Sequence, residues 1–105
     1  MAVAIAKTAA FAVRPESLAR CEEVIRGFVD DVTSEEPGTR VYVSLREQRD
    51  PTRFVHVMVF DDEVAEAAHR DAERTRRFTE ALYPHTLDGV AFTDCSLVAP
   101  ERRED

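Results

Sequence analysis

Cysteine, glycine and basic residues are scarce in this 105-residue chain, and each scarcity excludes a class of protein. Two cysteines, Cys21 and Cys95, are too few for a disulfide framework or for a zinc site built from cysteines. The three glycines form no glycine-rich phosphate loop, which argues against a nucleotide cofactor. Fourteen basic residues against 21 acidic ones give a net charge of −7, so we expect binding to neither nucleic acid nor an anionic membrane surface.

Long hydrophobic runs are also missing. The apolar run at residues 1–13 is interrupted by Lys7, is too short to cross a bilayer and has no basic stretch before it, so we interpret it as a strand and not as a signal peptide. Both cysteines lie within apolar patterns, which favours reduced, buried thiols. We therefore expect a small, acidic, soluble protein of the cytoplasm.

Hydrophobic periodicity predicts elements in the order β-α-β-β-α-β, which is typical of a ferredoxin-like α+β fold. In that fold a four-stranded antiparallel sheet carries its helices on one face. Residues 1–100 are expected to form the single domain, and residues 101–105 a solvated tail after Pro100. The predicted elements are a strand at 2–13, a helix at 16–32, strands at 39–47 and 53–60, two helical stretches between Asp61 and Tyr83-Pro84, a turn at Asp88-Gly89 and a strand at 90–99.

The predicted strands are apolar on both faces. Helices on one face of the sheet would leave the other face as a large exposed apolar patch. A second copy of the chain, packed sheet against sheet, would cover this face, so we expect a homodimer.

A series of short motifs runs through residues 35–84. They are Glu36-Pro37-Gly38, Tyr42, Asp50-Pro51-Thr52-Arg53-Phe54, Phe60-Asp61-Asp62, Ala68-His69, and Arg76-Arg77-Phe78 followed by Leu82. In this order and spacing they resemble the antibiotic biosynthesis monooxygenase family of the dimeric α+β barrel superfamily. The resemblance implies a ferredoxin-like monomer, a dimer, and a cavity between sheet and helices in each subunit.

Characterised members of that family include oxygenases that act on quinols or aromatic polyketides without metal or flavin, and enzymes that degrade haem. The haem-degrading relatives rely on a Trp and an Asn, and this chain contains neither. The resemblance therefore implies a cofactor-independent monooxygenase that uses dioxygen on a quinol or a polyphenolic, polyketide-type aromatic substrate. The alternative is a non-catalytic dimeric protein that binds a small ligand or is associated with stress. A haem or metal binder is a third hypothesis.

Oxygenation without a cofactor needs a base that removes a substrate proton, and histidine suits this role near neutral pH. His69 is the first candidate because Ala65 and Ala72 beside it leave room for a ligand, and because the family commonly has His there. Its alternative role is packing or capping, with a hydrogen bond to a neighbouring strand. His56 is the second candidate, and it either lines the cavity near His69 or is buried at the dimer interface.

Four further residues are candidates for substrate binding. They are Tyr42, Met58, Phe78 and Tyr83. The tyrosines either donate hydrogen bonds to a phenolic substrate or pack with their hydroxyls at an edge, and the other two fill either the core or the pocket. We assign no metal site, because two histidines alone do not supply enough ligands.

The remaining charged candidates have simpler interpretations. We expect Arg74, Arg76 and Arg77 to form a solvated helix face paired with nearby acids, and His85 to lie in a surface loop. Asp94 either orients a histidine or pairs with an arginine.

Overall fold

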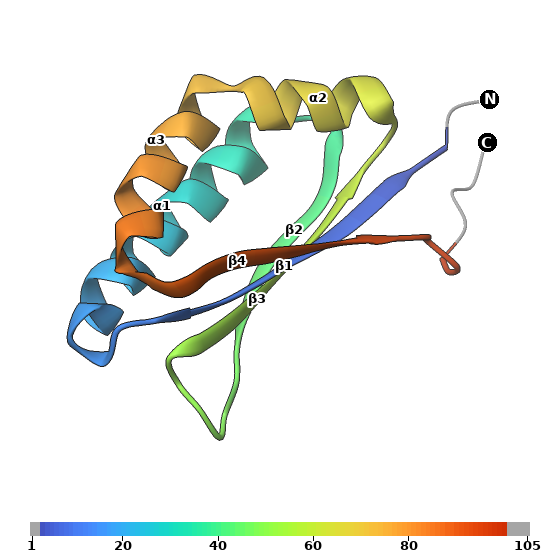
Figure 1. Cartoon of the computed structure of the whole chain (residues 1–105). Coiled ribbons are helices and arrows are strands. Elements are labelled where there is room, and N and C mark those ends of the chain that lie inside the picture. Colours follow the sequence, from blue (N-terminus) through green and yellow to red (C-terminus); the bar gives the residue numbers. More distant parts are fainter. Residues whose placement is uncertain (1–2, 101–105) are drawn as a thin grey trace.

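The computed structural model describes residues 3–100, which form a four-stranded antiparallel sheet with helices on one face (Figure 1). The strands are β1 (Ile5–Val13), β2 (Thr39–Arg46), β3 (Arg53–Phe60) and β4 (Thr86–Cys95), in the spatial order β2-β3-β1-β4. All three strand pairs are antiparallel. The predicted ferredoxin-like fold is thus confirmed.

Three helices cover the sheet on the same side in Figure 1: α1 (Leu18–Glu35), α2 (Glu63–Asp71) and α3 (Glu73–Leu82). Short 3-10 turns precede α1 at Pro15–Ser17 and follow α3 at Tyr83–His85. The carboxylate of Asp62 begins α2 by accepting a hydrogen bond from the Ala65 N–H at 2.8 Å. No helix in residues 3–100 is long and apolar enough to cross a membrane.

The last strand begins earlier than the sequence indicates. Asp88 and Gly89, predicted as a turn before the strand, lie inside β4 with φ angles of 61° and 75°. The pairing of β1 with β4 shifts register between Ala10 and Ala12, so the two residues form a bulge within the strand. The turn-like dipeptide is therefore accommodated by pairing on both sides of it.

The two cysteines differ in exposure. Cys21 is buried in the core, as predicted, whereas Cys95 is exposed. The prediction for Cys95 is wrong because this residue pairs with Ala6 at the end of β4, on the sheet face that the helices leave open. An apolar sequence pattern does not reveal which face of an edge strand is covered.

The core lies between the helices and one face of the sheet. Its buried side chains are Ala9, Phe11, Val13, Cys21, Ile25, Phe28, Val32, Phe54, Met58, Phe60, Phe78 and Leu82. The opposite face of the sheet is apolar too, as predicted, and the side chains of Val41, Val43 and Leu45 on β2 are 37%, 41% and 54% exposed there. The helices of this chain leave that face uncovered (Figure 1).

Candidate active site

A cavity of about 370 Å³ lies between the sheet and the helices, with mostly apolar walls. All six residues that the sequence nominates for the site line it: Tyr42, His56, Met58, His69, Phe78 and Tyr83. The ring of Tyr42 lies between the two histidines, with its centroid 5.5 Å from that of His56 and 5.5 Å from that of His69. The sequence-predicted candidates thus converge on one cavity.

His56 reaches the cavity because side chains alternate along β3. Phe54, His56, Met58 and Phe60 are all buried on the helix side of the sheet. His56 is thereby placed in the cavity of its own chain, and the other position left open by the sequence, a dimer interface, does not apply.

His69 is held by the carboxylate of Glu36. The His69 Nδ1 atom lies 2.7 Å from Glu36 Oε1, and both side chains are more than nine-tenths buried. A carboxylate can only accept, so Nδ1 carries the hydrogen and donates it. Because Nδ1 is engaged with Glu36, Nε2 is the ring nitrogen left for a ligand in the cavity that His69 lines.

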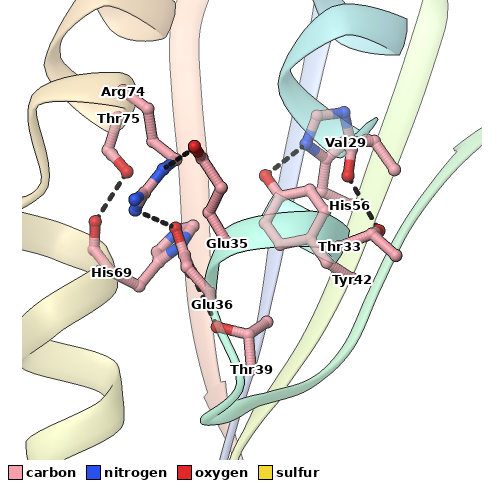
Figure 2. A network of polar contacts seen from close by, with 10 residues as sticks. All are labelled: Val29, Thr33, Glu35, Glu36, Thr39, Tyr42, His56, His69, Arg74 and Thr75. Carbon is pink, nitrogen blue, oxygen red and sulfur yellow. Dashed lines mark hydrogen bonds and ion pairs between the residues drawn. The ribbon is translucent and has the colours of Figure 1, made fainter. Parts of the chain in front are cut away.

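Glu36 is itself held by two further donors (Figure 2). The Thr39 hydroxyl donates to Oε1 at 2.7 Å, and Arg74 Nη1 donates to Oε2 at 2.8 Å. Burial alone would raise the pKa of Glu36, but the hydrogen bonds from Thr39, His69 and Arg74 outweigh it and lower this pKa. Glu36 therefore stays ionised and fixes the orientation of the His69 ring.

The sequence analysis missed the roles of Glu36 and Arg74. Arg74 pairs with acids as expected, in contact with both Glu35 and Glu36, but its side chain is only 26% exposed and is not part of a solvated helix face. Arg76 and Arg77 do lie on an exposed face, paired with Glu73. One signal was present in the sequence. Glu35 and Glu36 lie at the C-terminus of α1, where the helix dipole disfavours a negative charge unless a cation lies nearby.

Gly38 sets the position of α2 beside this network. A Cβ atom at Gly38 would lie 2.6 Å from the Cβ of Ala65, closer than two such atoms can approach. Only glycine therefore allows α2 to pack this closely against the loop after Glu36. The same packing brings His69, on α2, within hydrogen-bonding distance of Glu36.

Tyr42 and His56 form a second polar pair inside the cavity. The Tyr42 Oη atom lies 2.9 Å from His56 Nδ1, a contact drawn in Figure 2. Burial lowers the pKa of His56 to about 4, so its ring is neutral at ordinary pH. Burial also raises the pKa of Tyr42 well above its usual value, with the nearby Tyr83 and Glu36 contributing in the same direction. Both side chains thus stay uncharged.

Three charged side chains, Lys7, Glu66 and Arg70, also line the cavity. Glu66 accepts hydrogen bonds from Lys7 Nζ at 3.3 Å and from Arg70 Nη1 at 2.7 Å. Lys7 also lies 3.8 Å from Asp94, so the partner of Asp94 is a lysine and not a histidine or an arginine. Lys7, which interrupts the apolar pattern of β1, is therefore a cavity residue that sequence analysis did not nominate.

His85 does not belong to this site. His85 lies in the turn after α3, and its Nδ1 atom is 2.9 Å from the Ser17 hydroxyl. It is not among the residues that line the cavity. Within residues 3–100, no group of three or more histidine, cysteine, aspartate or glutamate side chains is arranged to hold a metal ion.

Comparison with known proteins places the chain in a family and shows its fold in solved structures. A family model described as antibiotic biosynthesis monooxygenase matches residues 4–81. No curated protein gives a significant match.

Solved structures share the fold at low sequence identity. A candidate antibiotic biosynthesis monooxygenase from Caulobacter crescentus is 19% identical, with a TM-score of 0.87, and the match covers 93% of this chain and 92% of that one. A candidate antibiotic biosynthesis monooxygenase from Nitrosomonas europaea is 17% identical, with a TM-score of 0.87, and the match covers 95% of each chain. Rv0793 from Mycobacterium tuberculosis is 19% identical, with a TM-score of 0.79, and the match covers 97% of this chain and 99% of that one.

Proposed function

Because the chain belongs to the antibiotic biosynthesis monooxygenase family, we propose that it is a cofactor-independent monooxygenase that oxidises a quinol or polyphenolic aromatic substrate with dioxygen. The observation that carries this proposal is the buried His69–Glu36 pair at a mostly apolar cavity. A base with a fixed orientation beside an apolar space is what this chemistry requires of a protein.

The reaction begins when a substrate hydroxyl gives its proton to His69 Nε2. The imidazolium that forms is stabilised by the ionised Glu36, which is already in contact with Nδ1. The substrate anion left in the cavity is electron-rich enough to reduce dioxygen itself. One oxygen atom is bonded to a substrate carbon, which loses its single hydrogen, and the other oxygen leaves as water with that hydrogen and the proton held on His69.

The walls of the cavity suit an aromatic ring. Phe28 and Phe78 stack with their ring centroids 4.0 Å apart and, with Phe60, supply flat apolar surfaces. The volume of about 370 Å³ falls in the range of small-molecule sites. Met58 and Tyr83 complete the substrate-binding residues of this proposal.

Oxygen uptake with a panel of quinols and anthrones tests this function. We expect His69→Ala to lower kcat by about 10²–10⁴-fold, the usual contribution of a general base. Glu36→Gln, which keeps the shape but removes the charge, should lower kcat by about 10–100-fold. His85→Ala is the matched control, and its rate should equal that of the wild type, because this residue does not line the cavity.

Two outcomes would contradict the proposal. If His69→Ala consumed oxygen at the wild-type rate, His69 would not be the base. If the panel bound in the cavity but no compound was oxidised, the non-catalytic ligand-binding alternative would replace the monooxygenase.

A further inference from the structure

We infer that Tyr42 donates its hydroxyl hydrogen to an oxygen atom of the ligand, and that His56 frees this hydrogen by donating its own Nδ1–H to Tyr42 Oη. This inference rests on the proposed function and deepens it by defining the substrate class. The ligand must carry a carbonyl or other acceptor oxygen in addition to the hydroxyl group that reaches His69.

The hydrogen bond between Tyr42 and His56 can be made in two ways. In one arrangement Tyr42 donates to a bare Nδ1, and the hydrogen of the neutral imidazole is then on Nε2. In the other arrangement Nδ1 carries the hydrogen and donates to Tyr42, and Nε2 is bare. The 2.9 Å separation fits both arrangements, so the surroundings of the other atoms decide between them.

The surroundings of His56 Nε2 favour the second arrangement. This atom is fully buried and has no hydrogen-bond partner among residues 3–100. A hydrogen on Nε2 would therefore be a buried donor with no acceptor, and buried donors without acceptors are rarer in proteins than underused acceptors. A bare Nε2 avoids that cost, and the His56 ring packs edge-on against the ring of Phe11, with the centroids 5.1 Å apart.

The hydroxyl of Tyr42 is then left with a hydrogen to donate. No other hydrogen bond from Tyr42 Oη is made within the described part of the chain, and Tyr42 lines the cavity. A ligand or a water molecule in the cavity can accept this hydrogen, whereas Nε2 is a buried atom without a partner among residues 3–100. The arrangement that satisfies every donor is thus the one in which Tyr42 donates into the cavity.

The position of Tyr42 connects this donor to the proposed base. Its ring lies between the two imidazoles, and its centroid is 5.5 Å from that of His69. A single aromatic ligand can therefore present a hydroxyl to His69 and an acceptor oxygen to Tyr42. Hydroxylated quinones and hydroxylated aromatic ketones have this pair of groups, whereas simple phenols do not.

Nitrogen-15 NMR of labelled histidines tests the hydrogen positions without any substrate. The variants His69→Gln and His85→Gln remove two of the three rings and so assign the signals of His56. At pH 7 we expect a protonated Nδ1 and an unprotonated Nε2 in His56. A protonated Nε2 would overturn the inference.

Anaerobic binding of two probes tests the role of Tyr42. A hydroxynaphthoquinone offers both a hydroxyl and a carbonyl oxygen, whereas a naphthol lacks the carbonyl. Tyr42→Phe should weaken binding of the quinone about tenfold and leave binding of the naphthol within about twofold. Equal losses for both probes, or no loss for either, would overturn the inference.

Variants of His56 separate positioning from packing. His56→Asn places an amide N–H close to the position of Nδ1 and should keep the preference for the quinone, whereas His56→Leu should lose it. Equal preferences in the two variants would overturn the role of His56. Because none of these measurements requires turnover, the inference can hold if oxygen uptake fails, and it can fail if oxygen uptake succeeds.

Discussion

At the residue scale, the two cavity histidines differ in what surrounds them. Nδ1 of His69 contacts the buried carboxylate of Glu36, whereas the only polar partner of His56 within residues 3–100 is the phenol of Tyr42. Removal from water without a compensating charge disfavours the imidazolium of His56. The same residue type is therefore suited to accepting a proton at one position and to remaining neutral at the other.

We expect His56 to make the stability of the protein depend on pH. Its pKa is about 4 in the folded protein against about 6.5 in the unfolded chain, so between these values the unfolded state binds more protons. The free energy of unfolding should therefore fall as the pH decreases from 6.5 to 4, by about 3 kcal/mol from this residue alone. Urea denaturation of the wild type and of His56→Asn, which does not titrate, measures this contribution as the difference between their slopes against pH. Parallel slopes would contradict the assignment.

The sequence revealed the site residues whose positions follow from local periodicity. His56 could be placed on a strand face by alternation with Phe54 and Met58, and His69 on a helix stripe by its small neighbours. Glu36 and Arg74 could not be assigned in this way, because Glu36 lies 33 residues from His69 and 38 residues from Arg74 along the chain. Contacts over such separations depend on how elements pack, which local patterns do not contain.

At the scale of elements, the fold was predictable wherever a strand or helix carried its own signal. The strands β2 and β3 and the helix α1 lie close to the predicted ranges. The start of β4 was not predictable, because Asp88-Gly89 is a turn signal that pairing with β1 converts into a bulge. Tertiary pairing here overrides a local preference.

The close approach of α2 to the loop after Glu36 yields a second stability prediction. Gly38→Ala would force its new Cβ against Ala65, so we expect a loss of about 1–3 kcal/mol in the free energy of unfolding and a displaced α2. Gly27→Ala is the matched control, because it lies within α1 with no atom within 4 Å of the added Cβ. This control should gain about 0.5–1 kcal/mol from the higher helix propensity of alanine. Chemical denaturation compares the two variants, and a Gly38→Ala protein as stable as the wild type would show that α2 is not fixed by this contact.

At the scale of the whole molecule, the sheet has two apolar faces and one layer of helices. The cavity, with Tyr42, His56 and His69, lies on the helix side of the sheet. The other face exposes Val41, Val43 and Leu45, which is costly in water for a protein that remains monomeric. We propose that a second copy of the chain covers this face, sheet against sheet, to form a homodimer.

Light scattering at micromolar concentration tests the dimer with a matched pair of variants. Val43→Glu would bury an unpaired carboxylate between the two sheets and should give a monomer, whereas Val64→Glu, 78% exposed on α2, should leave the dimer intact. Because the cavity lies on the helix side and Val43 on the opposite face of the sheet, the Val43→Glu monomer should still bind an aromatic ligand if it remains folded. A wild-type chain that is monomeric would contradict the proposal. Dissociation caused by Val64→Glu alone would assign the interface to the helices instead of the sheet.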